Sequence, residues 1–254
     1  MKFKFNLRRE VKIVTAIIIV GGIIAFTERR QGSASIRDIT IKMKNANENH
    51  FLDEDDIVKL MELKMDNLKG ASLDRVNMKE VEKRIRRDPF IKDAQLYSDL
   101  KGNLVVSAEI RRPIARIVRN DGPDGYIAED GTVMPVSDKF TSRVILISGP
   151  YVKQMLKQIN LNATEEGKQL ITLINTIRDD EFWNAQVAQL DIDSKMRITL
   201  YPQVGDERIE FGRPDNVDTK LKKLMIFYKE ILPRMGWSKY DRVNLEYEGQ
   251  IVAE

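Results

Sequence analysis

The sequence predicts an α+β protein with a single N-terminal transmembrane helix, a small domain of β-α-α-β-β order, and a β-rich domain with two helices. Three observations predict this class. The chain has one long apolar run, and it lies close to the N-terminus. Apolar residues then recur at strand and helix periods in a mixed order, which favours helices packed on one face of a sheet. With 254 residues, the chain is also long enough for a second domain with its own core.

Composition excludes several kinds of site. The chain has no cysteine, so a disulfide, a thiolate nucleophile and a cysteine-bound metal are all excluded. Its 42 basic and 39 acidic residues give a net charge of +3, but five of the basic residues and only one acidic residue lie within residues 1–12. The chain after this tail is therefore close to neutral, which argues against nucleic-acid binding.

The apolar run over residues 13–27 is the predicted transmembrane anchor, and residues 1–12 are its cytoplasmic tail. A helix normally needs roughly 17 to 25 residues to span a bilayer, so this run is short. Val11 and a snorkelling Lys12 lengthen it. Because positive charge precedes the run, we expect the N-terminus in the cytoplasm and everything after the run outside.

A cleaved signal peptide is the alternative for this run. The small residues 33–35 could form a cleavage site, but the charged residues 28–30 lie between them and the apolar core. The sequence therefore favours an uncleaved anchor, followed by a linker over residues 28–35. Both alternatives export the rest of the chain.

Residues 36–112 form the first predicted soluble domain. Acidic residues crowd the first turn after Asp53, where the helix dipole favours negative charge. Pro89 and Pro113 mark boundaries, because proline cannot donate a hydrogen bond to a central strand ladder. The predicted elements are a strand over 36–44, a helix opening at Asp53, a helix from Asp74 or Asn77 to Arg87, and strands over 91–97 and 104–110.

Residues 113–254 form the second predicted domain. Asp130-Gly131 lies between two apolar segments and predicts a hairpin turn. Thr164 can cap a helix that runs to Arg178. The other predicted elements are a buried strand over 143–148, paired strands over 187–193 and 196–201, a strand over 207–211, a helix over 218–232, and a final strand over 242–252 with Val243, Leu245 and Tyr247 on one face.

Four segments of the first domain carry a resemblance: residues 38–43, 52–57, 88–94 and 105–117. In this order they resemble a POTRA domain. The domain follows a single predicted anchor, and it ends in a phrase made of Glu109, Arg111 or Arg112, and Pro113–Ala115. This combination is similar to the bacterial cell-division family FtsQ/DivIB.

The second domain supports the same resemblance. Residues 126–135 resemble the family's hairpin, residues 211–224 its strand, glycine and following helix, and residues 242–252 its closing segment. The resemblance implies a non-enzymatic scaffold of the division septum that helps to regulate septal peptidoglycan synthesis. It also implies a protein of the cytoplasmic (inner) membrane whose main domains are extracytoplasmic, in the periplasm.

No pattern in the chain predicts a catalytic, cofactor or metal site, and no small-molecule substrate is expected. The single His50 lies in a polar turn without convergent partners. Residues 98–101 match the S-x-x-K phrase of penicillin-binding enzymes, but the companion motifs are absent. Four carboxylates lack the spacing of a calcium loop and are explained by turn chemistry: Asp121, Asp124, Glu129 and Asp130.

A basic run ends the second helix of the first domain: Lys83, Arg84, Arg86 and Arg87. Cations at a helix C-terminus complement the helix dipole, and that structural role explains the run. The alternative is contact with anionic lipid headgroups or with an acidic partner, because this domain begins a few residues after the predicted anchor.

The C-terminal segment is the predicted partner-binding site. An exposed sheet edge offers unpaired backbone groups that an incoming strand can complete. The resemblance implies that this segment receives the division protein FtsB, which travels with FtsL. The candidate residues are Val243, Leu245, Glu246, Tyr247, Gln250 and Ile251. Glu246 departs from the family pattern, which often carries a basic residue there, and an ordinary sheet strand without a partner stays an alternative.

Two other functions stay open. A POTRA-bearing chaperone for envelope assembly or secretion would fit the first domain, but the chain lacks the repeated POTRA units and barrel strands of such proteins. An envelope enzyme is disfavoured, because no nucleophile and base are found together in a recognisable motif.

Overall fold

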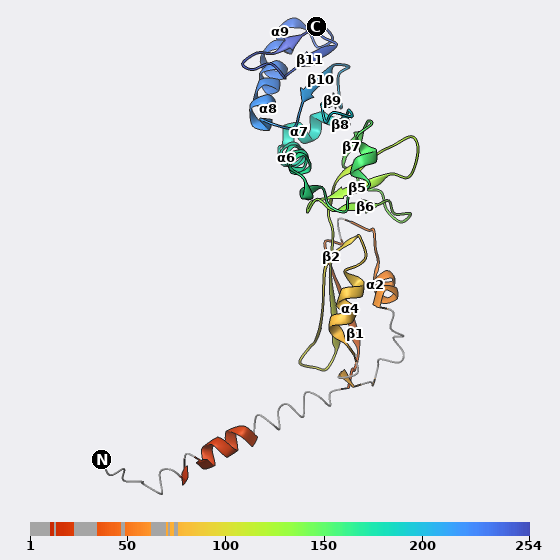
Figure 1. The fold of residues 1–254 in the computed structure, drawn as a ribbon, viewed down its shortest axis with the longest axis vertical. Coiled ribbons are helices and arrows are strands. Elements are labelled where there is room, and N and C mark those ends of the chain that lie inside the picture. Colours follow the sequence, from red (N-terminus) through yellow and green to blue (C-terminus); the bar gives the residue numbers. More distant parts are fainter. Residues whose placement is uncertain are drawn as a thin grey trace, which may run out of the picture. The chain divides into compact units, whose positions relative to one another are not determined.

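Figure 1 shows the fold in a computed structural model. The structure describes residues 11–12, 14–22, 35–46, 49–61, 70, 72–73 and 76–254. The chain divides into two compact units. Unit 1 holds the described residues up to Met43 together with Glu54–Asp88 and Asp93–Ala108, and unit 2 holds Lys44–Asp53, Pro89–Lys92 and Glu109–Glu254.

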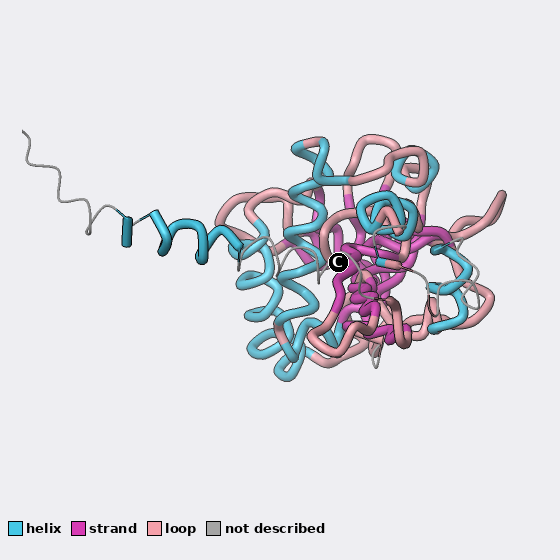
Figure 2. Tube along the Cα trace, turned by 90° about the horizontal axis from the view of Figure 1, so that it is seen from below, coloured by secondary structure: helices cyan, strands magenta, loops and turns pink. Residues whose placement is uncertain are grey.

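The N-terminal segment is helical at residues 11–12 and 14–22 (cyan in Figure 2). Within the described ranges, no helix has both the length and the apolar character needed to cross a membrane. The predicted anchor over residues 13–27 falls partly outside these ranges, at Ile13 and residues 23–27. Residues 1–10 of the predicted tail and residues 28–34 of the linker lie outside them as well.

Unit 1 confirms the β-α-α-β-β order. Its elements are β1 (Ile39–Lys44), α2 (Glu54–Met61), α4 (Met78–Ile85), β2 (Ile91–Ser98) and β3 (Leu104–Ile110). The strands form a sheet of order β1-β3-β2. Each helix turns an apolar face inward, with Ile57 and Met61 of α2 and Val81 and Ile85 of α4 buried. Asn77 caps α4 by accepting a hydrogen bond from the backbone of Glu80 at 3.2 Å, so the helix begins after Asn77 rather than at Asp74, which is not described.

Unit 2 is built on a nine-stranded sheet of order β12-β11-β10-β9-β8-β7-β4-β5-β6. Neighbouring strands are antiparallel except in the pairs β4–β7, β7–β8 and β10–β11, which are parallel. The strands are β4 (Pro113–Ile117), β5 (Gly125–Ala128), β6 (Val133–Pro135), β7 (Ile145–Ser148), β8 (Val187–Ile192), β9 (Ile198–Pro202), β10 (Arg208–Gly212), β11 (Arg242–Asn244) and β12 (Val252–Ala253).

Two helices were expected in this domain, and that prediction is wrong in number. The first helix ends at Asp180, whose backbone is extended. The Asp180 side chain then caps a second helix by accepting a hydrogen bond from the Trp183 N–H at 2.9 Å. The helix predicted over 218–232 continues to Met235. A π-turn within it accommodates Pro233. The helices are α5 (Val152–Met155), the 3₁₀ turn η2 (Leu161–Ala163), α6 (Glu165–Asp179), α7 (Glu181–Gln186), α8 (Val217–Ile226), the π-turn η3 (Phe227–Ile231) and α9 (Leu232–Met235).

Helices cover one face of the unit 2 sheet. A cross-strand row on that face, Ile147, Leu190, Leu200 and Ile209, is almost fully buried, and α6 and α8 lie along this side (Figure 1). The opposite, open face carries mostly polar side chains along β8–β10, but at the β5–β6 end its Tyr126 and Met134 are buried in a second apolar cluster. The strand over 143–148 was predicted to be buried, but β7 begins at Ile145 and Leu146 is 39% exposed, because the helices cover only one face.

Candidate partner-binding edge

The C-terminal segment is not one strand, so the prediction of a continuous strand over 242–252 is wrong. β11 covers only Arg242–Asn244, and the chain then turns back and pairs β12 antiparallel to β11. Two features make this turn possible. Gly249 has a φ of +69°, a conformation that L side chains rarely adopt. The Lys223 ammonium donates hydrogen bonds to backbone oxygens of the turning segment.

This turn makes β12 the edge of the sheet at its C-terminal end, because β11 lies between β10 and β12. The backbones of Arg242 and Glu254 exchange hydrogen bonds of 3.0 and 3.2 Å. In an antiparallel pair the bonded positions alternate, so the N–H and C=O groups of Ile251 and Ala253 point away from β11. The outer edge of β12 therefore offers donors and acceptors in strand geometry that no strand in the described part of the chain pairs with.

The predicted site residues separate into three groups by burial. Val243 and Leu245 are fully buried in the core of unit 2. Glu246 and Gln250 are exposed, and Tyr247 is 53% exposed. Ile251 is half-buried and packs on the core. The sequence pattern missed Ala253 as an edge residue, although Gly249 was a signal for a turn before it.

A charged cluster on the open face ties β10, β11 and β12 together. Arg242 donates two hydrogen bonds to the Glu210 carboxylate, at 2.7 and 2.8 Å, and a third to Glu254 at 3.2 Å. Asn244 donates to the same Glu210 carboxylate at 2.7 Å. The hydrogen bonds and positive charge of Arg242 hold the pKa of Glu210 below its usual range. The edge strand is thus fixed to its neighbours by side chains as well as by backbone.

Two residues of the basic run at the end of α4, Arg84 and Arg86, make contacts within unit 1. Arg86 forms ion pairs with Glu82 at 3.3 Å and Asp93 at 3.1 Å, and Arg84 donates to the backbone oxygen of Met61 at 2.9 Å. Lys83 and Arg87 are exposed. The structure leaves those two cations available at the surface.

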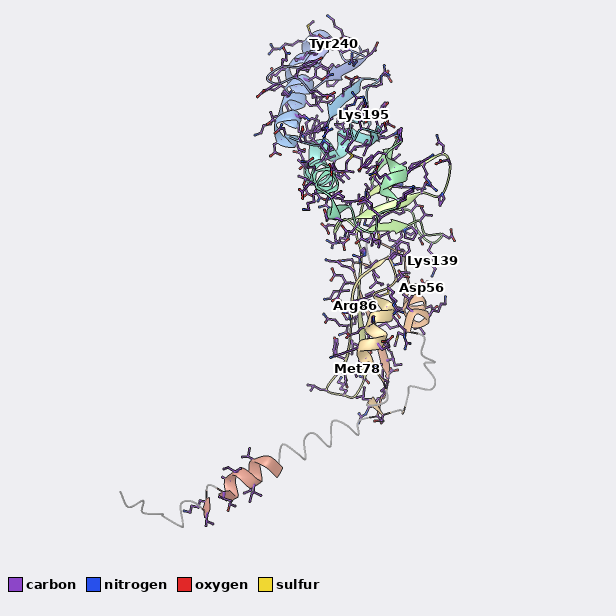
Figure 3. The ribbon with its side chains drawn as sticks, viewed as in Figure 1. Asp56, Met78, Arg86, Lys139, Lys195 and Tyr240 are labelled. Atoms are coloured by element: carbon purple, nitrogen blue, oxygen red, sulfur yellow. The ribbon has the colours of Figure 1, made fainter. Side chains whose placement is uncertain are left out.

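The basic run also lies at the far end of the unit 1 sheet from the entering chain. The backbone of Arg37 donates to Gly102 at 3.1 Å, which places the entry beside the β2–β3 turn. Arg86 pairs with Asp93, near the start of β2, and Figure 3 shows it at the opposite end of α4 from Met78. Contact of this run with anionic lipids or with an acidic partner stays an untested prediction, and this placement gives the lipid contact no support.

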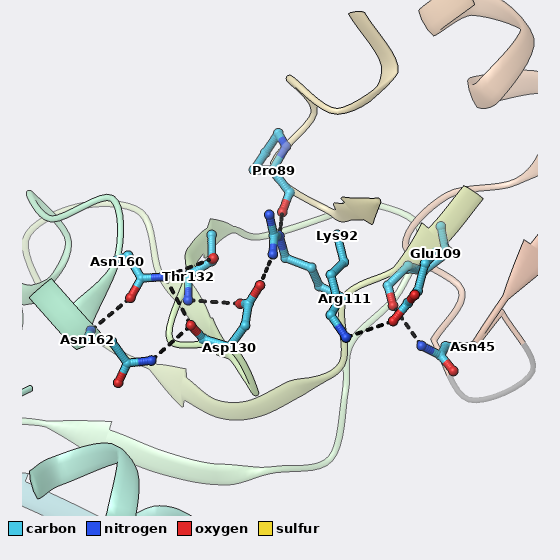
Figure 4. A network of polar contacts seen from close by, with 10 residues as sticks. Asn45, Pro89, Lys92, Glu109, Arg111, Asp130, Thr132, Asn160 and Asn162 are labelled. Carbon is cyan, nitrogen blue, oxygen red and sulfur yellow. Dashed lines mark hydrogen bonds and ion pairs between the residues drawn. The ribbon is translucent and has the colours of Figure 1, made fainter. Parts of the chain in front are cut away.

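The four carboxylates between residues 121 and 130 each have a cationic partner. Asp121 pairs with Lys153, Asp124 with Arg116, Glu129 with Arg178 and Asp130 with Arg111. Arg111 also donates to the backbone oxygen of Pro89 at 3.0 Å, and Asn160 and Asn162 donate to the backbone oxygen of Asp130 (Figure 4). These contacts give the four residues a structural role. In the described part of the chain, no group of three or more such side chains could hold a metal ion.

Family models match both parts of the chain. A model described as FtsQ/DivIB, C-terminal related, matches residues 112–254, which is more than half of the chain. A POTRA-like domain model matches residues 35–109. The chain belongs to the FtsQ/DivIB family. Its fold is accordingly a POTRA-like domain followed by a β-rich domain.

Individual relatives of the FtsQ/DivIB family are similar at modest identity. Cell division protein FtsQ of Geobacter sp. (strain M21) is 23% identical over 189 residues, which cover 73% of this chain and 66% of that protein, just under two thirds. FtsQ of Salinibacter ruber is 25% identical over 191 residues, 72% of each chain. Cell division protein DivIB of Clostridium acetobutylicum is 22% identical over 214 residues, which cover 84% of this chain and 81% of that protein.

Proposed function

We propose that this FtsQ/DivIB-family chain is a non-enzymatic scaffold of bacterial cell division that binds FtsB, together with FtsL, by strand addition at β12. Its relatives are named as cell division proteins. The observation that carries the proposal is the free outer edge of β12, with the backbone groups of Ile251 and Ala253 unpaired by β11. Through these partners the chain would help to regulate septal peptidoglycan synthesis.

The side chains of β12 define the partner strand. Ile251 and Ala253 pack on the core side of the sheet, whereas Val252 lies opposite Asn244, whose side chain joins the cluster on the open face. Because strand neighbours share a face, an added strand would place apolar side chains beside Ile251 and Ala253 and polar ones on the open face. The proposed partner segment is therefore an amphipathic strand with alternating apolar residues.

Tyr247 is the proposed side-chain anchor beside this edge. Its ring is half exposed in the loop that precedes β12. A tyrosine combines a large apolar surface with a polar tip, and such residues dominate protein interfaces. Replacing Tyr247 with Ala is expected to weaken FtsB binding by about 2 kcal/mol or more, which is roughly 30-fold in Kd.

A proline at the edge tests strand addition directly. Ala253→Pro removes an N–H that points away from β11 and leaves the β11–β12 hydrogen bonds intact. We expect this variant to lose most FtsB capture in a pull-down with purified proteins, while the control Ala253→Val retains it. Equal capture by both variants would contradict the proposed edge. Leu245→Pro is unsuitable, because the Leu245 N–H donates to the backbone oxygen of Glu210 at 2.9 Å inside the fold.

The proposed topology places the tail in the cytoplasm and both domains outside the cytoplasmic membrane, at the septum. The basic tail and the apolar run support it. Because the chain lacks cysteine, single cysteines report topology cleanly. In intact spheroplasts, an impermeant maleimide is expected to label Val204→Cys, a site 74% exposed, and to spare Lys4→Cys. Labelling of Lys4→Cys, or protection of Val204→Cys, would refute this orientation.

A further inference from the structure

Lys223 of α8 reaches the loop between β11 and β12, residues 245–251. Its ammonium donates to the backbone oxygens of Leu245 and Tyr247, each at 2.7 Å, and of Gln250 at 3.4 Å. An ammonium has three N–H donors, so these carbonyl groups use all of them. Three oxygens directed at one cation define the path of the backbone that joins them. Lys223 thus connects a helix of unit 2 to the whole length of the loop.

The electrostatics fit this arrangement. Burial and the nearby charge of Lys220 lower the pKa of Lys223, and the Glu248 carboxylate acts in the opposite direction. An ammonium that loses water needs replacement hydrogen bonds, and the loop carbonyls supply them. Lys220 does not compete for these oxygens, because it donates to the backbone of Arg213 at 2.8 Å and to Asp215 at 2.6 Å.

We infer that Lys223 is a positioning residue for partner capture. By holding the three carbonyl groups, it keeps the Tyr247 ring at the surface and returns the chain to the sheet at Val252, where the free edge begins. Binding would then find the loop already ordered and would not have to order it. This inference rests on the proposed function, and it adds a residue that lies outside the binding edge itself.

A lysine suits this position better than an arginine. The ammonium is a compact point charge whose three donors diverge toward carbonyl groups on different sides. A planar guanidinium directs its donors in one plane and is built for carboxylates and phosphates. Lys223→Met keeps the length and the apolar stem of the side chain and removes only the donors and the charge. Lys222→Met is the matched control, because Lys222 is the exposed neighbour on the same helix.

The test uses the full chain in detergent and purified FtsB from the same bacterium as the probe. We expect Lys223→Met to raise the Kd for FtsB at least tenfold and to speed amide hydrogen exchange in residues 245–253. Exchange in β8, β9 and α6 is expected to be unchanged. Lys222→Met should match the wild-type chain in both measurements.

The outcomes separate this inference from the proposed function. If Lys223→Met binds like the wild-type chain while Tyr247→Ala and Ala253→Pro are weakened, the positioning role is wrong and the proposed edge stands. If the wild-type chain does not capture FtsB, the proposed function and this inference both fail. Weaker binding with faster exchange throughout the β8–β9 hairpin would assign Lys223 to the general stability of unit 2 and would also overturn the inference.

Discussion

Tyr228 donates its hydroxyl to the Glu207 carboxylate at 2.7 Å, and both residues are buried in unit 2. Burial, together with the hydrogen bond to Glu207, raises the pKa of Tyr228, so the hydroxyl keeps its proton at any physiological pH. Phe182, Trp183 and Phe227 lie edge-on to the Tyr228 ring, with centroids 5.8–6.2 Å away. The ring is therefore part of the core, and the hydroxyl donates to a buried carboxylate.

Tyr228→Phe is expected to lower the free energy of unfolding by about 1–3 kcal/mol, because Glu207 loses its buried donor. Urea denaturation of residues 36–254 measures this change. Tyr240→Phe is the control, since the Tyr240 hydroxyl makes no hydrogen bond within the described residues, and its effect should stay within about 0.5 kcal/mol. Equal effects of the two variants would show that the Tyr228–Glu207 hydrogen bond adds nothing to the free energy of unfolding.

Glu210 gives unit 2 a specific response to acid. Its pKa is lowered in the fold by Arg242, so the carboxylate contributes stability that is fully present above the ordinary glutamate pKa of about 4.3. That contribution is lost as the pH falls through the lower, folded value. Melting temperatures measured from pH 7 to pH 3 should fall less for Glu210→Gln than for the wild-type chain. Glu248→Gln, at an exposed loop residue, should follow the wild-type profile.

The turn after β7 shows how backbone conformation constrains an element. Gly149 has a φ of +100°, and a Cβ added there would lie 2.4 Å from the backbone oxygen of Ile192 and 2.8 Å from its nitrogen. These atoms belong to the end of β8, which pairs with β7. Glycine is required both by the dihedral angle and by the close approach of the neighbouring strand.

Gly149→Ala is expected to destabilise unit 2 by about 2–5 kcal/mol, the sum of a left-handed conformation and a backbone overlap. Gly236→Ala is the matched control. Gly236 has a similar φ of +104°, but nothing lies within 4 Å of its added Cβ. Its cost should be about 1–3 kcal/mol, from the unfavourable backbone conformation alone. Thermal unfolding of the two variants should show the difference, and similar melting temperatures would mean that the approach to Ile192 relaxes easily.

At the scale of the whole molecule, unit 2 contains segments that precede residue 109. Phe51 stacks on Phe90 with ring centroids 5.0 Å apart, and it meets Tyr126 and Phe140 edge-on at 5.3 and 5.2 Å. Met134 joins the same cluster. Phe51 and Phe90 therefore supply part of the apolar core of unit 2, although the POTRA-like model covers both residues.

A fragment of residues 112–254 is expected to be less stable than residues 36–254, because it lacks Phe51 and Phe90. Losing one buried phenylalanine side chain typically costs about 3–5 kcal/mol. Trp183 is buried in unit 2 and reports its unfolding by fluorescence once the exposed Trp237 is replaced by Phe. Phe51→Ala within residues 36–254 should reproduce much of the loss. Identical denaturation midpoints for the two fragments would show that the cluster does not contribute.

Interactions between residues close in sequence determined much of the fold. Alternating apolar residues predicted the paired strands over 187–193 and 196–201, and β8 and β9 confirm them. The Thr164 cap is present, with its hydroxyl accepting from Gly167 at 3.1 Å. Gly131 turns the predicted hairpin with a φ of +81°. Each of these features depends on neighbours within a few positions, so the local pattern is sufficient to predict it.

Contacts between distant residues decided the rest, above all the edge strand β12 on which the proposed function rests. Residues 242–252 alternate like a strand, but Lys223, about twenty positions earlier, holds three of their carbonyl groups and the chain turns back at Gly249. The sequence pattern predicts a buried Leu146. The residue is exposed because it lies on the face of the sheet that the helices do not cover. The sequence by itself determined the family, the β-α-α-β-β order of the first domain and the absence of cysteine chemistry. Only the tertiary structure decided that Ala253, rather than Val243, carries the free backbone, because strand pairing brings together groups that no local pattern relates.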